Sequence, residues 1–239
     1  MLSITLIIII STVIVSVIAF KNEQVMDNLI FYPPAVTEKN QYYRFITCGF
    51  IHADIGHLAF NMISFYLFSN GLVEPAFIGF FGDYGRALLL LMYVLALIVC
   101  LLPTYFKNKN NQQYRSLGAS GAVSAVVFAG LMISPLSQIG FFIIPPIIPG
   151  FIFGPLYLII SAYMEKRGGD NINHSAHIWG ALFGVAFIII ATKLYSDYDV
   201  WTHFIDDVQY YFKTIINSFT NNPDYFFIRL QNPYIFFFC

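Results

Sequence analysis

The sequence predicts an all-α integral membrane protein, in which a bundle of six transmembrane helices is followed by an amphipathic tail. Of the 239 residues, 58% are hydrophobic and only 10% are charged, whereas a soluble domain carries about 25% charged residues. The mean hydropathy is +0.68. The apolar residues form long runs without the alternation of a transmembrane barrel, and helices satisfy their own backbone groups in lipid. The composition therefore excludes an ordinary soluble domain and makes the lipid bilayer the expected surroundings.

Charge and cysteine content exclude further classes. The formal net charge is −1, and no basic block indicates nucleic acid as a partner. Cys48, Cys100 and Cys239 are odd in number and lack CxxC spacing, so we expect neither a disulfide framework nor a metal site.

Six apolar runs are separated by polar segments. We expect the spans at residues 2–20, 57–72, 87–106, 118–134, 151–164 and 174–195. A cleaved signal peptide is the alternative for the first run, but that run is longer than the usual apolar region of such a peptide. We divide the chain into a membrane domain at residues 1–196 and a tail at residues 197–239.

Two segments fit this scheme less simply. Residues 134–150 carry Pro135, Pro145, Pro146 and Pro149, and prolines break a uniform helix. An extension of the fifth span back to residue 139 therefore stays open. In the tail, apolar side chains recur at helical spacing at Phe204, Val208, Phe212, Ile215 and Phe219. This pattern predicts an amphipathic helix at the membrane surface.

Polar residues open three of the spans on the same side of the membrane. His57 and Asn61 are four residues apart in the second span, Ser120 opens the fourth, and His177 lies in the first turn of the sixth. Even-numbered spans all begin on one side, so these residues are expected at a similar depth. Polar groups inside a membrane are costly and are usually functional.

These residue types suit acyl transfer. A serine hydroxyl needs a base, and His177 can take the Ser120 proton and return it to a leaving amine. The amide of Asn61, a ring nitrogen of His57 and the backbone N–H of Ser120 can donate to an oxyanion. We identify no carboxylate for a triad, because Asp170 lies in the loop before the sixth span, so a Ser–His dyad is expected.

Small residues supply the helix approach that this dyad needs. Gly180 and Gly184 form a face that lets two membrane helices come close. The alternatives are that Gly118 to Gly121 serve only packing, that His177 is a capped helix residue, and that Asn61 joins two helices. His52 and His57 could also face water at the membrane interface.

Together these residues make the chain resemble the rhomboid family of intramembrane serine proteases over residues 40–190. The family motifs stand as Gly118-Ala119-Ser120-Gly121, His57 with Asn61 and the upstream His52, and Ala176-His177 with Gly180 and Gly184. Arg44, after Tyr43, matches the loop arginine, and Glu74 matches a structural glutamate. Ser124 departs from the family, in which an aromatic residue often stacks on the catalytic histidine.

The resemblance implies cleavage of peptide bonds in transmembrane protein substrates through an acyl-enzyme, without a cofactor or metal. Two alternatives remain: a catalytically inactive rhomboid-like protein that binds transmembrane clients, and a small transporter. The absence of an HExxH motif disfavours a metalloprotease.

Location and orientation rest on opposing indications. We expect a multi-pass protein of a prokaryotic plasma or inner membrane, and the resemblance puts the active site on the non-cytoplasmic side. The positive-inside rule favours the reverse, because loops on the active-site side carry most of the basic residues, namely Lys21, Lys39, Arg44, Lys107, Lys109, Arg115, Lys166 and Arg167. Those on and beyond the opposite side are Arg86, Lys193, Lys213 and Arg229.

Overall fold

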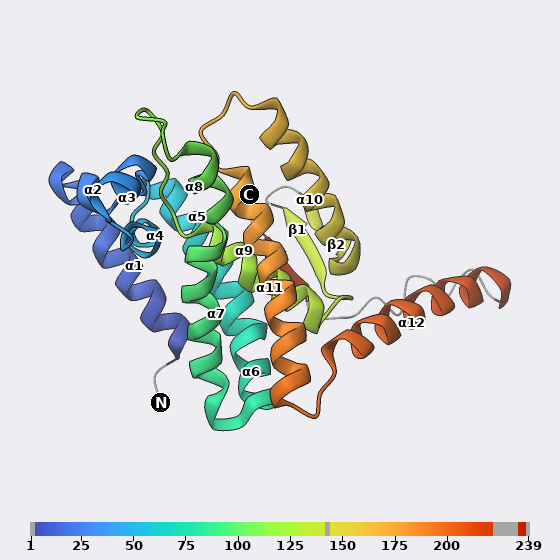
Figure 1. Cartoon of the computed structure of the whole chain (residues 1–239). Helices are drawn as coiled ribbons and strands as arrows, with labels where there is room; N and C mark the ends of the chain where they lie inside the picture. The colour runs from blue at the N-terminus through green and yellow to red at the C-terminus, as the bar shows by residue number, and fades with distance from the viewer. Residues whose placement is uncertain (1–2, 142–143, 222–233, 238–239) are drawn as a thin grey trace.

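The computed structural model describes residues 3–141, 144–221 and 234–237, and within these it is mostly helical (Figure 1). The α-helices are α1 (Ile4–Phe20), α2 (Glu23–Leu29), α3 (Pro33–Lys39), α4 (Arg44–Thr47), α5 (Ile55–Phe65), α6 (Glu74–Phe81), α7 (Gly85–Val99), α8 (Leu102–Asn108), α9 (Ser120–Ile133), α10 (Gly150–Arg167), α11 (His174–Tyr195) and α12 (Val200–Asn221). Shorter or wider helical segments are η1 (Cys48–Phe50), η2 (Tyr66–Val73) and η3 (Gly82–Tyr84), and the strands are β1 (Gln138–Phe141), β2 (Ile144–Pro149) and β3 (Tyr234–Phe237). Arg229 and Cys239, which entered the sequence predictions, lie outside the described residues.

Helix α9 forms the centre of the bundle. It packs mainly against α11, and also against α7, α5 and η2 (Figure 1). Every residue from Gly121 to Met132 is buried, which explains its small side chains, because a helix surrounded by others allows close backbone approach only where side chains are short.

The α9–α11 contact depends on glycine. A Cβ atom built on Gly180 would overlap the carbonyl oxygen of Gly121 and lie 2.8 Å from its carbonyl carbon. A Cβ on Gly184 would overlap the Ala125 carbonyl oxygen in the same way, one turn further along. The spacing of these two glycines therefore sets how closely α11 approaches α9.

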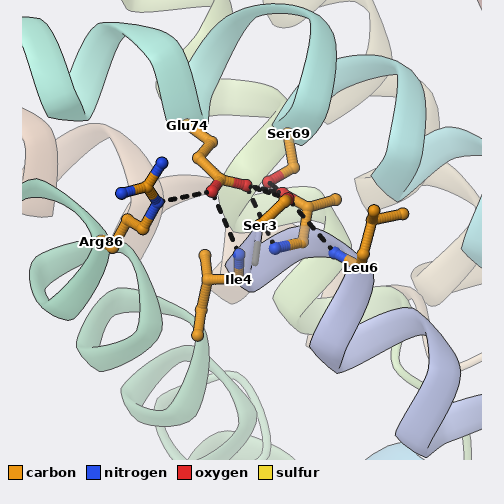
Figure 2. Close-up of polar contacts among 7 residues, drawn as sticks. Ser3, Ile4, Leu6, Ser69, Glu74 and Arg86 are labelled. Atoms are coloured by element: carbon orange, nitrogen blue, oxygen red, sulfur yellow. Dashed lines mark hydrogen bonds and ion pairs between the residues drawn. The ribbon is translucent and has the colours of Figure 1, made fainter. Parts of the chain in front are cut away.

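Helix α1 is joined to the bundle by a carboxylate (Figure 2). Glu74 is buried and accepts hydrogen bonds from Ser3 Oγ at 2.6 Å, Ile4 N at 3.0 Å and Thr5 N at 3.1 Å. Thr5 Oγ1 also donates to it at 2.6 Å, and Arg86 Nε donates at 3.2 Å. A carboxylate at a helix N-terminus satisfies free N–H groups and complements the helix dipole. Glu74 thus has a structural position, at the start of α6.

Two helical segments among the described residues are long and apolar enough to cross a membrane. They are Ile55–Asn108, which runs through several of the elements above, and His174–Tyr195. Ile4–Phe20 and Ser120–Ile133 are apolar but shorter. The six-span arrangement therefore remains a prediction.

The prediction of a purely helical fold is wrong at residues 138–141 and 144–149, which form strands, and so is the prediction of a helix extended back to residue 139. Strands β1 and β2 pair in antiparallel orientation, and β3 pairs with β1 in parallel, giving the order β2-β1-β3. The prolines at 145, 146 and 149 remove donors and prevent helix formation. Strand β3 belongs to the tail, which is distant in sequence, so no local sequence pattern predicts its pairing with β1.

The tail begins as an amphipathic helix, as its spacing predicts. Helix α12 extends from the end of α11 away from the bundle (Figure 1). The middle of α12 contacts the start of α10. The Phe151 ring centroid lies 5.3 Å from that of Tyr211 and 5.8 Å from that of Phe212.

Candidate active site

A tight turn presents Ser120 at the start of α9. Gly118, two residues earlier, has a φ of +109° and donates its N–H to the Cys48 carbonyl at 2.9 Å. A Cβ on Gly118 would lie 2.7 Å from Cε1 of His57. Only glycine fits both that backbone conformation and that ring. As Ser120 is the first residue of α9, its N–H has no carbonyl partner within the helix.

His177 reaches Ser120 from the first turn of α11. Its Nε2 lies 2.7 Å from Ser120 Oγ, which is the length of a good hydrogen bond. Asn173 caps α11 by accepting from Ala176 N at 3.0 Å, and its side chain also bonds Thr104 and Ser116. These hydrogen bonds connect the start of α11 to α8 and to the loop before α9, and they fix the position of His177 relative to Ser120.

His57 and Asn61 line the same cavity as Ser120 and His177. Asp54 caps α5 by accepting from His57 N at 2.8 Å. The Asn61 side chain is almost fully buried and donates one N–H to the His57 carbonyl at 3.0 Å. An amide nitrogen carries two hydrogens, so one remains for a group in the cavity.

His52 is fully buried, so its interpretation as a histidine facing water is wrong. Its Nδ1 lies 3.0 Å from Ser16 Oγ on α1, and its Nε2 accepts from Ala119 N at 3.4 Å. Its ring packs edge-on against His57 with centroids 4.9 Å apart. His52 therefore links α1, the His57 ring and the turn before Ser120.

The cavity has a volume of about 880 Å³ and lies over the starts of α5, α9 and α11. Polar side chains from the loops on either side also line it, including Tyr114, Arg115, Asp170 and Asn173. Cys48 and Cys100 form part of the wall, and both are free thiols. A Cβ on Gly121 would lie only 2.5 Å from the Cys100 sulfur, so Gly121 is also needed for close packing.

Arg44 and Glu74 are not among the residues that line this cavity, although Arg44 bonds Ile30, which is. Arg44 is buried in the first loop, where it donates to Gln41 Oε1 at 2.7 Å, to the Asp27 carbonyl at 2.8 Å and to the Ile30 carbonyl at 2.6 Å. Three directed bonds from one guanidinium organise the loop.

One pair near the site is not evident from sequence. His174 Nε2 lies 3.0 Å from Asp170 Oδ2, in the loop before α11. The hydrogen bond with His174 lowers the pKa of the Asp170 carboxyl below its ordinary value, and the Ile172 N–H lowers it further. The spacing of four residues is visible in the sequence, but the contact depends on how the loop folds.

No group of three or more His, Cys, Asp or Glu side chains within residues 3–141, 144–221 and 234–237 is arranged to hold a metal ion. The geometry at Ser120 instead offers a hydroxyl, an imidazole in contact with it, and nearby N–H donors. That set can perform nucleophilic catalysis with general acid–base assistance.

Comparison with known proteins matches residues 39–194 to the Rhomboid domain. Among curated relatives, RHOMBOID-like protein 12, mitochondrial, from Arabidopsis thaliana is 26% identical over 67% of this chain and 49% of its own length. Presenilin-associated rhomboid-like protein A, mitochondrial, from Danio rerio is 28% identical over 60% of this chain and 36% of its own. Rhomboid protease GlpG from Haemophilus influenzae is 26% identical over 70% of this chain and 78% of its own.

The chain thus spans half or less of the two organelle relatives named above. Because the relatives include mitochondrial proteins beside a bacterial one, they do not support the expectation of a prokaryotic plasma membrane.

Proposed function

Since the chain belongs to the rhomboid family, we propose that it is a serine endopeptidase that cleaves peptide bonds in or near transmembrane segments of membrane proteins. The observation that carries the proposal is the 2.7 Å contact between Ser120 Oγ and His177 Nε2 across two helices. A contact of this kind activates a hydroxyl that is otherwise a weak nucleophile.

In the proposed reaction, Ser120 Oγ attacks the peptide carbonyl carbon while His177 takes the hydroxyl proton. The Ser120 backbone N–H, the His57 ring and the Asn61 amide donate to the oxyanion. Collapse of this intermediate breaks the C–N bond, and His177 gives its proton to the departing amine. Water then attacks the acyl-enzyme with His177 again as base, which releases the acid product and restores Ser120.

The cavity supplies what a membrane site lacks. Hydrolysis needs water, and lipid excludes it, whereas the cavity of about 880 Å³ is lined by polar loop residues. The proposal includes six membrane spans for residues 1–196, of which α1, α9 and α10 are shorter or interrupted, and it puts the cavity on the non-cytoplasmic side. A reporter fused after α12 and expressed in cells would test the side.

The test of function is cleavage of a reporter transmembrane substrate in liposomes. We expect cleavage by the wild type and none by Ser120→Ala or His177→Ala. Ser124→Ala is the matched control, because Ser124 is a buried serine one turn further along α9, and it should cleave at the wild-type rate. A folded wild type that binds the substrate without cutting it would support an inactive client-binding protein instead.

A further inference from the structure

His177 needs support on the side that does not face Ser120. A catalytic imidazole must keep one ring orientation through two proton transfers, and small errors of position are costly. The residue one turn after Ser120 is Ser124, whose short side chain is buried within α9. The ring that does lie beside His177 belongs to His174.

His174 and His177 share one face of α11, since residues three apart lie side by side on a helix. Their ring centroids are 6.0 Å apart and their planes are inclined by 78°, an edge-to-face arrangement typical of aromatic pairs. The His174 side chain is only 11% exposed, so its ring is confined by its surroundings.

Asp170 fixes the other end of His174. One carboxylate oxygen lies 3.0 Å from His174 Nε2, and the other accepts the Ile172 N–H at 3.1 Å. Both oxygens are therefore held. The Asp170 charge also acts on His177 itself.

The remaining charged groups around His174 do not replace Asp170. A second cavity of about 190 Å³ borders His174, and Lys107 of α8 and Glu165 of α10 line it. These two form an ion pair at 2.8 Å, so their charges largely offset each other. Tyr114 from the loop before α9 also lines this cavity, and His57 of α5 lines the larger cavity together with His177.

We propose that Asp170 and His174 form a positioning unit for His177. The His174 ring holds the imidazole in line with Ser120, and the Asp170 carboxylate, acting through His174, favours the imidazolium that forms during acylation. The arrangement places a carboxylate one residue further from the base than in a Ser–His–Asp triad.

This inference rests on the proposed function, and its test separates the two. Kinetics of reporter cleavage and the rate of fluorophosphonate labelling at Ser120 would be measured for Asp170→Asn, His174→Phe and His174→Ala. Asp199→Asn is the matched control, because Asp199 is also an exposed aspartate that accepts backbone N–H groups, at the start of α12.

We expect Asp170→Asn to lower kcat about tenfold with KM little changed, since general acid–base catalysis contributes about 10²–10⁴-fold in all. The acid limb of its pH–rate profile should move to lower pH, because the protonated imidazole loses a favourable charge. His174→Phe, which keeps a ring at that position, should retain more kcat than His174→Ala. Asp199→Asn should match the wild type.

Unchanged kcat and an unchanged pH profile in Asp170→Asn, with Ser120→Ala inactive, would overturn the positioning unit and leave the proposed function standing. Equal rates in the Phe and Ala variants of His174 would overturn the part assigned to its ring. A folded wild type that neither cleaves nor is labelled would overturn both.

Discussion

Gly180 allows a direct test of how helix packing sets the distance between Ser120 and His177. In Gly180→Ala, the new methyl carbon would lie 2.8 Å from the carbonyl carbon of Gly121, whereas carbon atoms in contact are about 3.5–4.0 Å apart. Helix α11 must therefore move away from α9 by about 1 Å. Gly121 directly follows Ser120, so the separation occurs at the level of the site.

The magnitude follows from the Ser120–His177 distance of 2.7 Å. An increase of about 1 Å takes it beyond hydrogen-bond range, and a misplacement of this size costs about 10²-fold in rate. Overpacking of a well-packed contact also costs about 1–3 kcal/mol of stability. Gly180→Ala should thus lose cleavage by about two orders of magnitude and unfold at a lower temperature.

The assay is thermal unfolding in detergent together with cleavage well below the unfolding temperature. Gly184→Ala should lose similar stability, because its methyl carbon would lie 2.6 Å from the Ala125 carbonyl carbon, but less activity, since it is one turn further from the site. Gly79→Ala is the control, because no atom beyond its chain neighbours and its own helix backbone lies within 4 Å of its methyl position. A Gly180→Ala protein with wild-type stability and rate would refute the reasoning.

Three further predictions concern single residues. Glu74→Gln should lower the free energy of unfolding by about 2–3 kcal/mol, because an amide cannot accept all the donors at the start of α1. Cleavage at low temperature should persist, since Glu74 lies about 25 Å along the helix from His57. Loss of stability and of low-temperature cleavage together would contradict this prediction. In Gly118→Ala, an alanine would have to adopt a φ of +109°, and its methyl carbon would lie 2.7 Å from His57 Cε1. We therefore expect at least about a tenfold loss of cleavage. Undiminished cleavage would show that the turn adapts. Because the pKa of Asp170 is lowered, its hydrogen bonds stabilise the fold at pH values above its ordinary pKa, and this contribution disappears as the pH falls through the lowered pKa. Acid unfolding curves should show this loss of stability in the wild type and not in Asp170→Asn. Coincident curves for the two proteins would exclude this contribution.

The sequence predicts the centre of the fold well because its signals there are local. The Gly180–Gly184 face, the small residues of α9 and the hydroxyl of Ser120 each restrict what can lie beside them. The resemblance to the rhomboid family is confirmed by the match over residues 39–194. The roles of Ser120 and His177 stay predictions, although the structure brings these side chains into contact.

Features set by distant partners could not be predicted. Burial of His52 depends on Ser16, 36 residues earlier, and polarity alone suggests a histidine facing water. The strand pairing of β1 with β3 joins segments almost a hundred residues apart. The prolines of residues 134–150 exclude a uniform helix, but they do not predict which structure forms instead.

The most direct test of the account is the identity of the residue modified by a fluorophosphonate in intact membranes, read by peptide mass spectrometry. The account predicts an adduct on Ser120 in the wild type that is lost in His177→Ala and kept in Ser124→Ala. Labelling of Ser120 that persists in His177→Ala, or modification of another serine only, would contradict it.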